Sequence, residues 1–385
     1  MDTRPIAQPD ARMLVRARIA VSIAFLVMGT GAGLWGVHIP VVAERLGLAP
    51  ATIGLGLLCA ATGAVLNMPL TGAALTRLSS RPPTAALTLA FAVLTPFPIL
   101  APWPWFLFVS LFLWGAAMGG LDVAMNTQAT EVEAARRKPT MSSFHGFFSV
   151  GALIGSSLGG LIVGSGWGDG RGALIVAAVL LVAGIWSAFN LWPSAPPDHA
   201  GPRFTLPPAA VLGIGAITLL AFAGEGAVSD WSALFLSKVK GTSAGVAASG
   251  LIVFSVAMIV CRLTGDRVVA ALGATTIVFA GGLLMAAGIA IAVVAPWPIV
   301  SALGFGIVGI GAANLAPVGF SAASRTPGVP ASVGVAAVTT MGYAGFLVSP
   351  PTLGFVANAW GLPVALGIVA VMGLAITALT GAVRR

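Results

Sequence analysis

The chain has 385 residues, of which 58% are hydrophobic and only 8% are charged. About a quarter of the residues in ordinary soluble domains are charged. A chain this apolar cannot cover itself with polar surface, so the composition excludes an ordinary soluble protein and indicates one embedded in lipid. The formal net charge is +8. The basic residues stand singly between apolar segments, as signals of membrane orientation do, and we expect no nucleic-acid partner.

Apolar stretches separated by charges and by clusters of Pro and Gly predict twelve spanning helices in an all-α membrane protein. A helix that crosses the hydrocarbon core needs about 20 mostly apolar residues. The expected spans are 18–43, 51–76, 83–101, 103–130, 140–165, 172–192, 208–236, 243–263, 269–294, 297–322, 331–357 and 362–382. The first span follows several Arg residues, as the core of a signal peptide would, but it is too long for one. We expect it to be a retained first helix.

The distribution of Lys and Arg predicts the orientation of these spans. Positively charged residues concentrate in cytoplasmic loops. With a cytoplasmic N-terminus, only four of the 19 basic residues fall on the outer side, namely Arg45, Arg171, Lys238 and Lys240. An even number of spans returns the chain to the side on which it began. The sequence therefore predicts that both termini face the cytoplasm.

A repeated string divides the chain into two similar parts. The sequence Ala-Pro-Trp-Pro at 101–104 recurs at 295–298, and each copy begins a predicted helix. Internal repeats of this kind occur in transporters whose substrate site lies between the repeats, near the bilayer midplane. We predict two parallel six-helix halves, residues 1–193 and 208–385, joined by a short Pro-rich cytoplasmic linker at 194–207.

The loop after the second predicted helix resembles the signature of the major facilitator superfamily, and the resemblance extends over essentially the whole chain. The family pattern is Gly, three residues, Asp, Arg or Lys, one residue, Gly and then basic residues. Gly72, Arg77 and Arg81 fit this pattern, whereas Thr76 and Ser79 replace the acid and the second Gly. The resemblance implies a cytoplasmic latch between helices. The loss of the acid at Thr76 weakens the latch of the first half.

The second half carries a related loop, Arg262, Asp266 and Arg267, which keeps the acid–base pair but lacks the leading Gly. The strings at 121–126, 142–146 and 225–231 resemble a bacterial inner-membrane branch of the family that is distantly similar to fucose permeases. This similarity implies a monomeric secondary transporter that takes up a small, neutral polar solute, such as a sugar, together with protons by alternating access. It also implies a location in the bacterial inner membrane.

Ionisable residues inside predicted spans are candidates for proton coupling, because such groups are costly in lipid. Asp122 lies in the fourth span, with Asn126 four residues further on the same helical face. His145 lies in the fifth span at a similar expected depth, and Glu225 lies between two glycines in the seventh. A carboxyl group in a dry cavity is suited to carry a proton. A structural hydrogen bond to a neighbouring helix is the alternative for each residue.

Neutral hydrogen-bonding and aromatic residues within the spans are the candidates for substrate binding. They are His38, Trp35, Asn67, Asn126, Asn314 and Tyr343. We expect two gates: an outer one with His38, Glu225 and Asp230, and an inner or central one with Asp122, Asn126, His145, Asn314 and Tyr343. The alternative is that polar residues simply avoid lipid. No Arg or Lys is expected deep in a span, which argues mildly against carboxylate or phosphate substrates.

Other functions receive weaker support from the sequence. The patterns G-x-S-x-G at 155–159 and G-x-G-x-x-G at 304–309 lie inside apolar helices and not at strand-to-helix turns, so we expect no enzyme. No Cys and His spacing suggests a metal or another cofactor. A glycine run at 151, 155 and 159 resembles the helix-five motif of drug/proton antiporters, although Ser156 replaces its Pro. A proton-driven exporter of amphipathic compounds therefore remains the alternative.

Overall fold

The structure is a computed structural model that describes residues 11–48, 50–166, 170–194, 207–242, 244–247 and 249–384. The first half contains α1 (Ala11–Arg45), α2 (Pro50–Leu75), α3 (Arg81–Leu94), α4 (Pro96–Leu100), α5 (Pro104–Arg136), α6 (Met141–Gly164) and α7 (Arg171–Asn190). The second contains α8 (Ala209–Lys238), α9 (Ala244–Ala247), α10 (Ser249–Leu272), α11 (Ala274–Val294), α12 (Pro298–Ala312), α13 (Leu315–Ser324), α14 (Ala331–Trp360) and α15 (Leu362–Ala378), followed by a short 3-10 helix, Leu379–Val383.

Eleven helical segments of the described chain are long and apolar enough to cross a membrane. Two of them, 81–100 and 298–324, are each built from two helices, α3 with α4 and α12 with α13. The 24-residue α10, which carries three charged residues, supplies the remaining span. The predicted all-α fold with twelve spans is confirmed.

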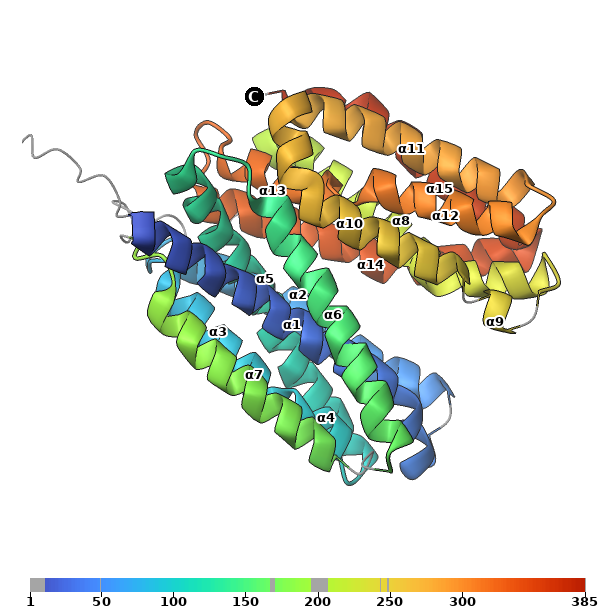
Figure 1. The fold of residues 1–385 in the computed structure, drawn as a ribbon, viewed down its shortest axis with the longest axis horizontal. Helices are drawn as coiled ribbons and strands as arrows, with labels where there is room; N and C mark the ends of the chain where they lie inside the picture. The colour runs from blue at the N-terminus through green and yellow to red at the C-terminus, as the bar shows by residue number, and fades with distance from the viewer. Residues whose placement is uncertain are drawn as a thin grey trace, which may run out of the picture.

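The spans form two bundles, α1–α7 and α8–α15, which lie beside each other (Figure 1). Across the interface α6 packs on α10 and α2 packs on α14. The end of the molecule at which α7 ends and α8 begins is called the linker end here. The proposed division at 194–207 stays a prediction, because residues 195–206 lie outside the described part of the chain.

The repeated string begins a helix in the same way in both halves. Trp103 and Trp297 are the extended residues before α5 and α12, and each is followed by a Pro in the first turn. Proline suits this position, because its fixed φ fits the helix and its missing N–H would have no partner there. The repeat in the sequence is therefore also a repeat in local structure.

A cation braces the same place in each half, at the end of the molecule opposite the linker end. Each side chain donates two hydrogen bonds to carbonyl groups where a neighbouring span ends: Arg45 to Ile99 (2.6 Å) and Ala101 (3.0 Å), Lys240 to Val293 (3.1 Å) and Ala295 (2.6 Å). The last carbonyl groups of a helix lack partners within the helix and carry partial negative charge. A cation at this place therefore stabilises the end of the span.

The tenth span differs from the single helix expected at 297–322. It is divided into α12 and α13 at Ala313 and Asn314. Pro317 has no N–H, so it cannot donate to the carbonyl group of Ala313 one turn earlier. The break therefore leaves a backbone acceptor in the middle of the protein.

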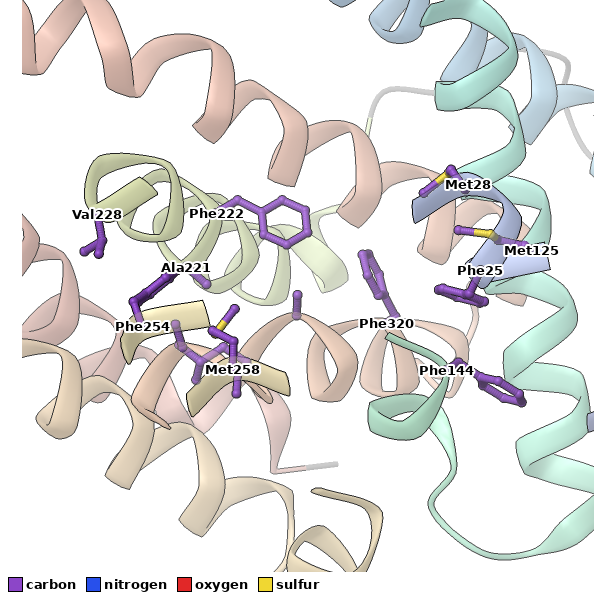
Figure 2. Packing of buried hydrophobic residues seen from close by; sticks show 14 of the residues in the cluster. Phe25, Met28, Met125, Phe144, Ala221, Phe222, Val228, Phe254, Met258 and Phe320 are labelled. Carbon is purple, nitrogen blue, oxygen red and sulfur yellow. The ribbon is translucent and has the colours of Figure 1, made fainter. Parts of the chain in front are cut away.

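Aromatic side chains from both halves meet between the bundles (Figure 2). Phe25 of α1 stacks on Phe144 of α6 at a centroid distance of 5.8 Å, and the His145 ring stacks on Phe320 of α13 at 5.3 Å. Phe25, Phe144 and Phe320 are fully buried, and aromatic rings from both halves therefore pack around His145.

Candidate functional site

A cavity of about 660 Å³ lies between the two halves and is lined by α1, α2, α5, α6, α8, α10 and α14. On α2 its lining residues fall between 57 and 65, mostly in the half of the helix nearer its start. On α14 they fall between 343 and 351, mostly beyond the middle of the helix. These parts of α2 and α14 point away from the linker end, so the cavity lies toward the opposite end.

Four acidic or basic side chains line this cavity: Asp122, His145, Glu225 and Arg262. They come from α5, α6, α8 and α10, two helices of each half. Most of the remaining lining residues are aliphatic, aromatic or Met. The three residues predicted for proton coupling therefore share one cavity, together with a cation that was expected elsewhere.

The first polar group belongs to the first half. Asn126 donates to the Asp122 carbonyl oxygen at 2.8 Å and to the Asp122 Oδ1 at 3.2 Å, as residues four apart on a helix can. His145 Nε2 lies 3.1 Å from the Asn126 Oδ1. The Asp122 Oδ2 is buried without a hydrogen-bond partner among the described residues. An unpartnered buried oxygen is costly, and a proton or a solute hydroxyl group would satisfy it.

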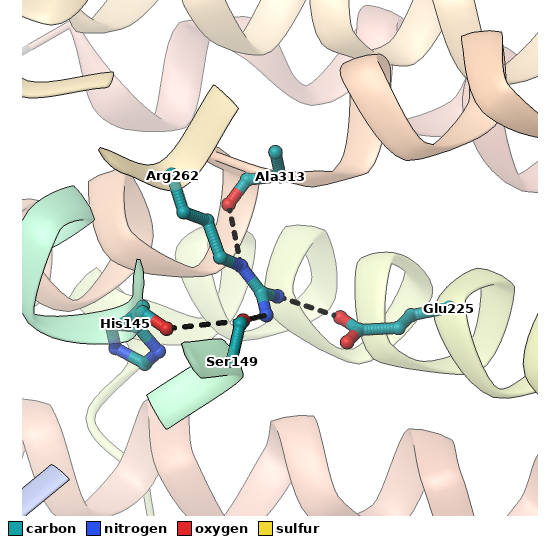
Figure 3. A network of polar contacts seen from close by, with 5 residues as sticks. All are labelled: His145, Ser149, Glu225, Arg262 and Ala313. Carbon is teal, nitrogen blue, oxygen red and sulfur yellow. Dashed lines mark hydrogen bonds and ion pairs between the residues drawn. The ribbon is translucent and has the colours of Figure 1, made fainter. Parts of the chain in front are cut away.

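The second polar group is a buried ion pair in the second half. Arg262 Nη2 lies 3.0 Å from the Glu225 Oε2, and the two side chains are only 5% and 19% exposed. Arg262 Nε also donates to the Ala313 carbonyl group at 3.2 Å. This is the acceptor that Pro317 leaves free, so the break in the tenth span helps to position the charge (Figure 3).

Ser149 of α6 joins the two polar groups. Its Oγ donates to the His145 carbonyl oxygen at 3.2 Å and accepts from Arg262 Nη1 at 3.0 Å. A hydroxyl group both donates and accepts, which allows this bridge. Asp122, Asn126, His145, Ser149, Arg262 and Glu225 thus form a continuous chain that crosses between the halves.

The expectation that no basic residue lies deep in a span is wrong. The eighth span was expected to end at 263, but α10 continues to Leu272. Arg262 therefore lies about 15 Å from the end of the helix, at 1.5 Å per residue. It lines the cavity and pairs with Glu225 there, away from the latch to which it was assigned. The argument against anionic substrates that rested on a missing cation does not hold.

The residues predicted for substrate binding fall into two sets. Tyr343 lines the cavity, with its ring edge-on to Phe222 at a centroid distance of 6.2 Å. Asn126 lies behind Asp122. Four others do not line the cavity: Trp35, His38, Asn67 and Asn314.

Three of these four residues have backbone partners in the helix packing. Asn67 donates to the Ala116 carbonyl group at 2.8 Å, and Asn314 donates to that of Cys261 at 3.2 Å. The His38 Nδ1 lies 2.8 Å from the Leu34 carbonyl oxygen, and His38 is fully buried. The structure therefore does not place His38 with Glu225 in one outer group, and Asp230 is exposed.

The sequence interpretation missed the bridging role of Ser149 and the role of Pro317. The only signal for Ser149 was its position four residues after His145, one helical turn along the same face. Aromatic lining residues such as Phe148, Phe222 and Phe346 carried no signal beyond their type. The Trp114 Nε1, in contrast, is a buried donor without a partner among the described residues, and Trp114 lines the cavity.

One carboxylate joins the halves at the linker end. The Asp266 Oδ1 of α10 accepts from the Ser143 N–H, in the first turn of α6, at 3.1 Å. This contact is named the linker-end latch. A carboxylate at a helix N-terminus is stabilised by free N–H groups and by the helix dipole. The Arg18 Nη2 donates to the Ser143 Oγ at 3.4 Å and adds a cation beside this contact.

Glu133 holds the same helix start from within the first half. Its Oε2 accepts from the Thr140 and Met141 N–H groups at 2.8 and 3.0 Å, and its Oε1 lies 3.9 Å from the Arg325 guanidinium of the second half. The first turn of α6 is thus held by two carboxylates, one from each half.

The other predicted latch residues make no polar contact between the halves among the interactions that the structure gives. Arg81 donates to the Phe189 carbonyl group at 3.0 Å within the first half. Arg77 and Arg267 are exposed. Gly72 is buried against Ala336, where a Cβ would meet the Ala336 side chain, so its role is close packing of α2 on α14.

The described residues contain no group of three or more His, Cys, Asp or Glu side chains arranged to hold a metal ion.

Comparison with known proteins places the chain in a family. The sequence profile of the Major Facilitator Superfamily matches residues 21–265. An uncharacterised MFS-type transporter of Yersinia pestis is 37% identical over 374 residues, which cover 96% of this chain and 97% of the relative. The membrane protein MosC of Rhizobium meliloti is 32% identical, over 92% of this chain and 87% of its own length.

A solved structure of the same architecture is that of FucP, the fucose:proton symporter of E. coli, in the outward conformation. It superposes with a TM-score of 0.82 at 17% identity and covers 97% of this chain and 100% of that chain. At this identity the likeness concerns the fold alone. Together with the profile match and the bacterial relatives it confirms the expected resemblance: the chain belongs to the major facilitator superfamily of multi-pass membrane transporters.

Proposed function

We propose that this protein is a proton-coupled importer of a small, neutral polar solute, such as a sugar, in the bacterial inner membrane. The observation that carries the proposal is the unpartnered Asp122 Oδ2 in a cavity shared by both halves. Intramembrane ionisable residues in such cavities commonly mark ion and proton pathways. Two proteins of similar structure, the fucose:proton symporter FucP and the proton:xylose symporter XylE, support the same interpretation.

The charge of the cavity favours a neutral solute. Arg262 and Glu225 neutralise each other at 3.0 Å, so the pair offers no net charge to a substrate. Asp122 and Tyr343 provide hydrogen-bonding groups, and the aromatic walls provide flat surfaces for the apolar face of a ring. A solute hydroxyl group that donates to the Asp122 Oδ2 would satisfy the oxygen that the protein leaves unpaired.

The arrangement of the two ends supports alternating access. The cavity lies toward the end opposite the linker, while the linker-end latch closes the other end. With both termini in the cytoplasm, as the distribution of basic residues indicates, this is a state that receives solute from outside. Because the two halves of one chain complete the cavity, we propose that the monomer is the transporting unit.

The test is transport by purified protein in liposomes with Asp122→Asn. The solute is first identified by thermal stabilisation of the protein with sugars, polyols, amino acids and lipophilic cations, since a ligand of the folded state raises the unfolding temperature. We expect Asp122→Asn to reduce solute accumulation driven by a pH gradient by about 100-fold or more. The variant should still exchange labelled for unlabelled solute. Asp230→Asn, which alters an exposed carboxylate, is the matched control.

Two outcomes decide against the proposal. Accumulation by Asp122→Asn at the rate of the unchanged protein would remove Asp122 from the coupling mechanism. Stabilisation by lipophilic cations alone would favour the exporter of amphipathic compounds. The aromatic and Met side chains of the cavity wall, among them Met28, Trp114 and Met118, are the observation in favour of that second function.

A further inference from the structure

A second cavity, of about 640 Å³, lies on the first half at the linker end and shares no lining residue with the central cavity. It is lined by α1, the end of α5, the loop that follows α5, and Phe147 of α6. Val15 and Ile19, which line it, are 58% and 45% exposed. The cavity is therefore a groove at the surface of the protein and not part of the solute pathway.

Three cations gather in this groove. Arg18 is the last charged residue of α1 before a long uncharged stretch, Arg136 ends α5, and Lys138 follows in the loop. All three line the groove, and no Asp or Glu is among its described lining residues. Cations held this close together repel one another, and an anion between them removes that repulsion.

Most of the remaining lining of the groove is apolar, and one part of it follows α1 from Arg18 toward the middle of the helix. Ile19, Ile23 and Leu26 lie on successive turns of α1 and line it, with Phe147 opposite. Leu26 is eight residues beyond Arg18, or about 12 Å along the helix axis. The groove thus combines a basic end at the edge of the spans with an apolar channel of about two turns that runs toward the membrane core.

We propose that this groove binds an anionic phospholipid. The phosphate group lies between Arg18, Arg136 and Lys138, and an acyl chain lies along Ile19, Ile23 and Leu26. A soluble anion would satisfy the cations and leave the apolar channel uncovered, whereas a phospholipid satisfies both. Basic pockets between spans on the cytoplasmic side are suited to acidic headgroups.

The site adjoins the linker-end latch through Arg18. The same guanidinium that lines the groove donates to the Ser143 Oγ, and the Ser143 N–H donates to Asp266. A bound phosphate would hold Arg18 beside the first turn of α6. The lipid would therefore act on the end of the molecule that has to open during transport.

The experiment is a titration of delipidated, detergent-purified protein with phosphatidylglycerol, followed by its unfolding temperature. Phosphatidylcholine with the same acyl chains and inorganic phosphate are titrated in parallel. We expect saturable stabilisation by phosphatidylglycerol alone, as for a ligand of the folded state. In Arg136→Gln/Lys138→Gln the apparent affinity should fall about 30-fold, or about fivefold for each charge removed near an anionic lipid.

The matched control is Arg77→Gln/Arg267→Gln, which removes the same charge from exposed positions outside the groove. Equal stabilisation by phosphatidylcholine or by inorganic phosphate would overturn the proposal, and so would an equal loss of affinity in the control. If the groove variant does not fold, native mass spectrometry of the unchanged protein and of Ile23→Trp, which fills the channel, gives the decision. Retention of phosphatidylglycerol by the unchanged protein and its loss from Ile23→Trp would support the proposed lipid site. Equal retention by both proteins would contradict the proposal.

Discussion

The two halves of this transporter are alike where they hold their helices together and different where they face each other. Arg45 and Lys240 brace equivalent helix ends in the same way. Asn67 of α2 and Arg262 of α10 each donate to a backbone carbonyl group of a neighbouring span. Only Arg262, however, brings a charge that pairs with a carboxylate in the cavity.

The linker end shows the same contrast more sharply. Asp266 in the second half reaches across to the first turn of α6. Thr76 stands where the family pattern of the first half has an acid, and its Oγ1 donates to the Ala73 carbonyl group of its own helix at 2.8 Å. The helix-end braces are thus present in both halves. The linker end is joined by Asp266 with Ser143 and by Arg325 with Glu133, whereas Thr76 bonds within its own helix.

The largest effect is expected at the buried ion pair. Arg262→Met leaves Glu225 buried without its partner, which should lower the free energy of unfolding by about 3 kcal/mol, the lower end for such pairs because Glu225 is partly exposed. Arg262→Met/Glu225→Met should recover most of this loss. Asn67→Leu, which removes one side-chain hydrogen bond between spans of the first half, should cost about 1 kcal/mol, the value of one neutral hydrogen bond.

Unfolding in detergent, monitored by tryptophan fluorescence against denaturant concentration, measures these differences. Arg81→Met, which removes an arginine that bonds within the first half, serves as the reference for loss of a cation. Equal costs for Arg262→Met and Asn67→Leu would mean that the two halves do not differ in the way that we describe.

The braces should behave as a matched pair. Arg45→Met and Lys240→Met each lose two hydrogen bonds to carbonyl groups from a partly exposed cation, and each should cost about 1 kcal/mol in unfolding free energy. The thermal unfolding of both variants would be compared with that of Lys238→Met, an exposed neighbour that should change little. If only one of the two variants lowers the stability, the two braces do not contribute equally to the free energy of unfolding.

The smallest effect on stability, but a direct one on conformation, is expected at the linker-end latch. Asp266→Ala removes a carboxylate that caps a helix start, a change that costs about 1 kcal/mol. We therefore expect the linker end to open about five times more often. The labelling rate of a cysteine placed at the buried Ser142, in protein without its two native cysteines, would report this opening.

Thr76→Asp is the converse variant. It restores the acid of the family pattern at a buried position and should slow the same labelling by a factor of about two, the effect of one charge near a helix terminus. Labelling that is unchanged in both variants would contradict the assignment of Asp266 as the residue that closes this end.

The sequence contained most of the architecture because the architecture depends on local signals. The repeated Ala-Pro-Trp-Pro string and the apolar stretches predicted the spans and their halves, and the four-residue spacing placed Asn126 beside Asp122. The position of Arg262 was missed because three charges ended the apolar pattern at 263. The charged residues of this helix are stabilised by partners that are distant in the sequence: Arg262 pairs with Glu225, and Asp266 accepts a hydrogen bond from the Ser143 N–H.

Pro317 gives the tenth span a hinge. The Ala313 carbonyl group at this joint holds Arg262, while α13 beyond it packs against α6 at the linker end. A bend between α12 and α13 would therefore pull on the guanidinium and lengthen or shorten its approach to Glu225. Opening of the linker end would then be coupled mechanically to the distance between Arg262 and Glu225 in the cavity. Spin labels on α12 and α13 would report the bend as a change in the distance between the labels when solute binds.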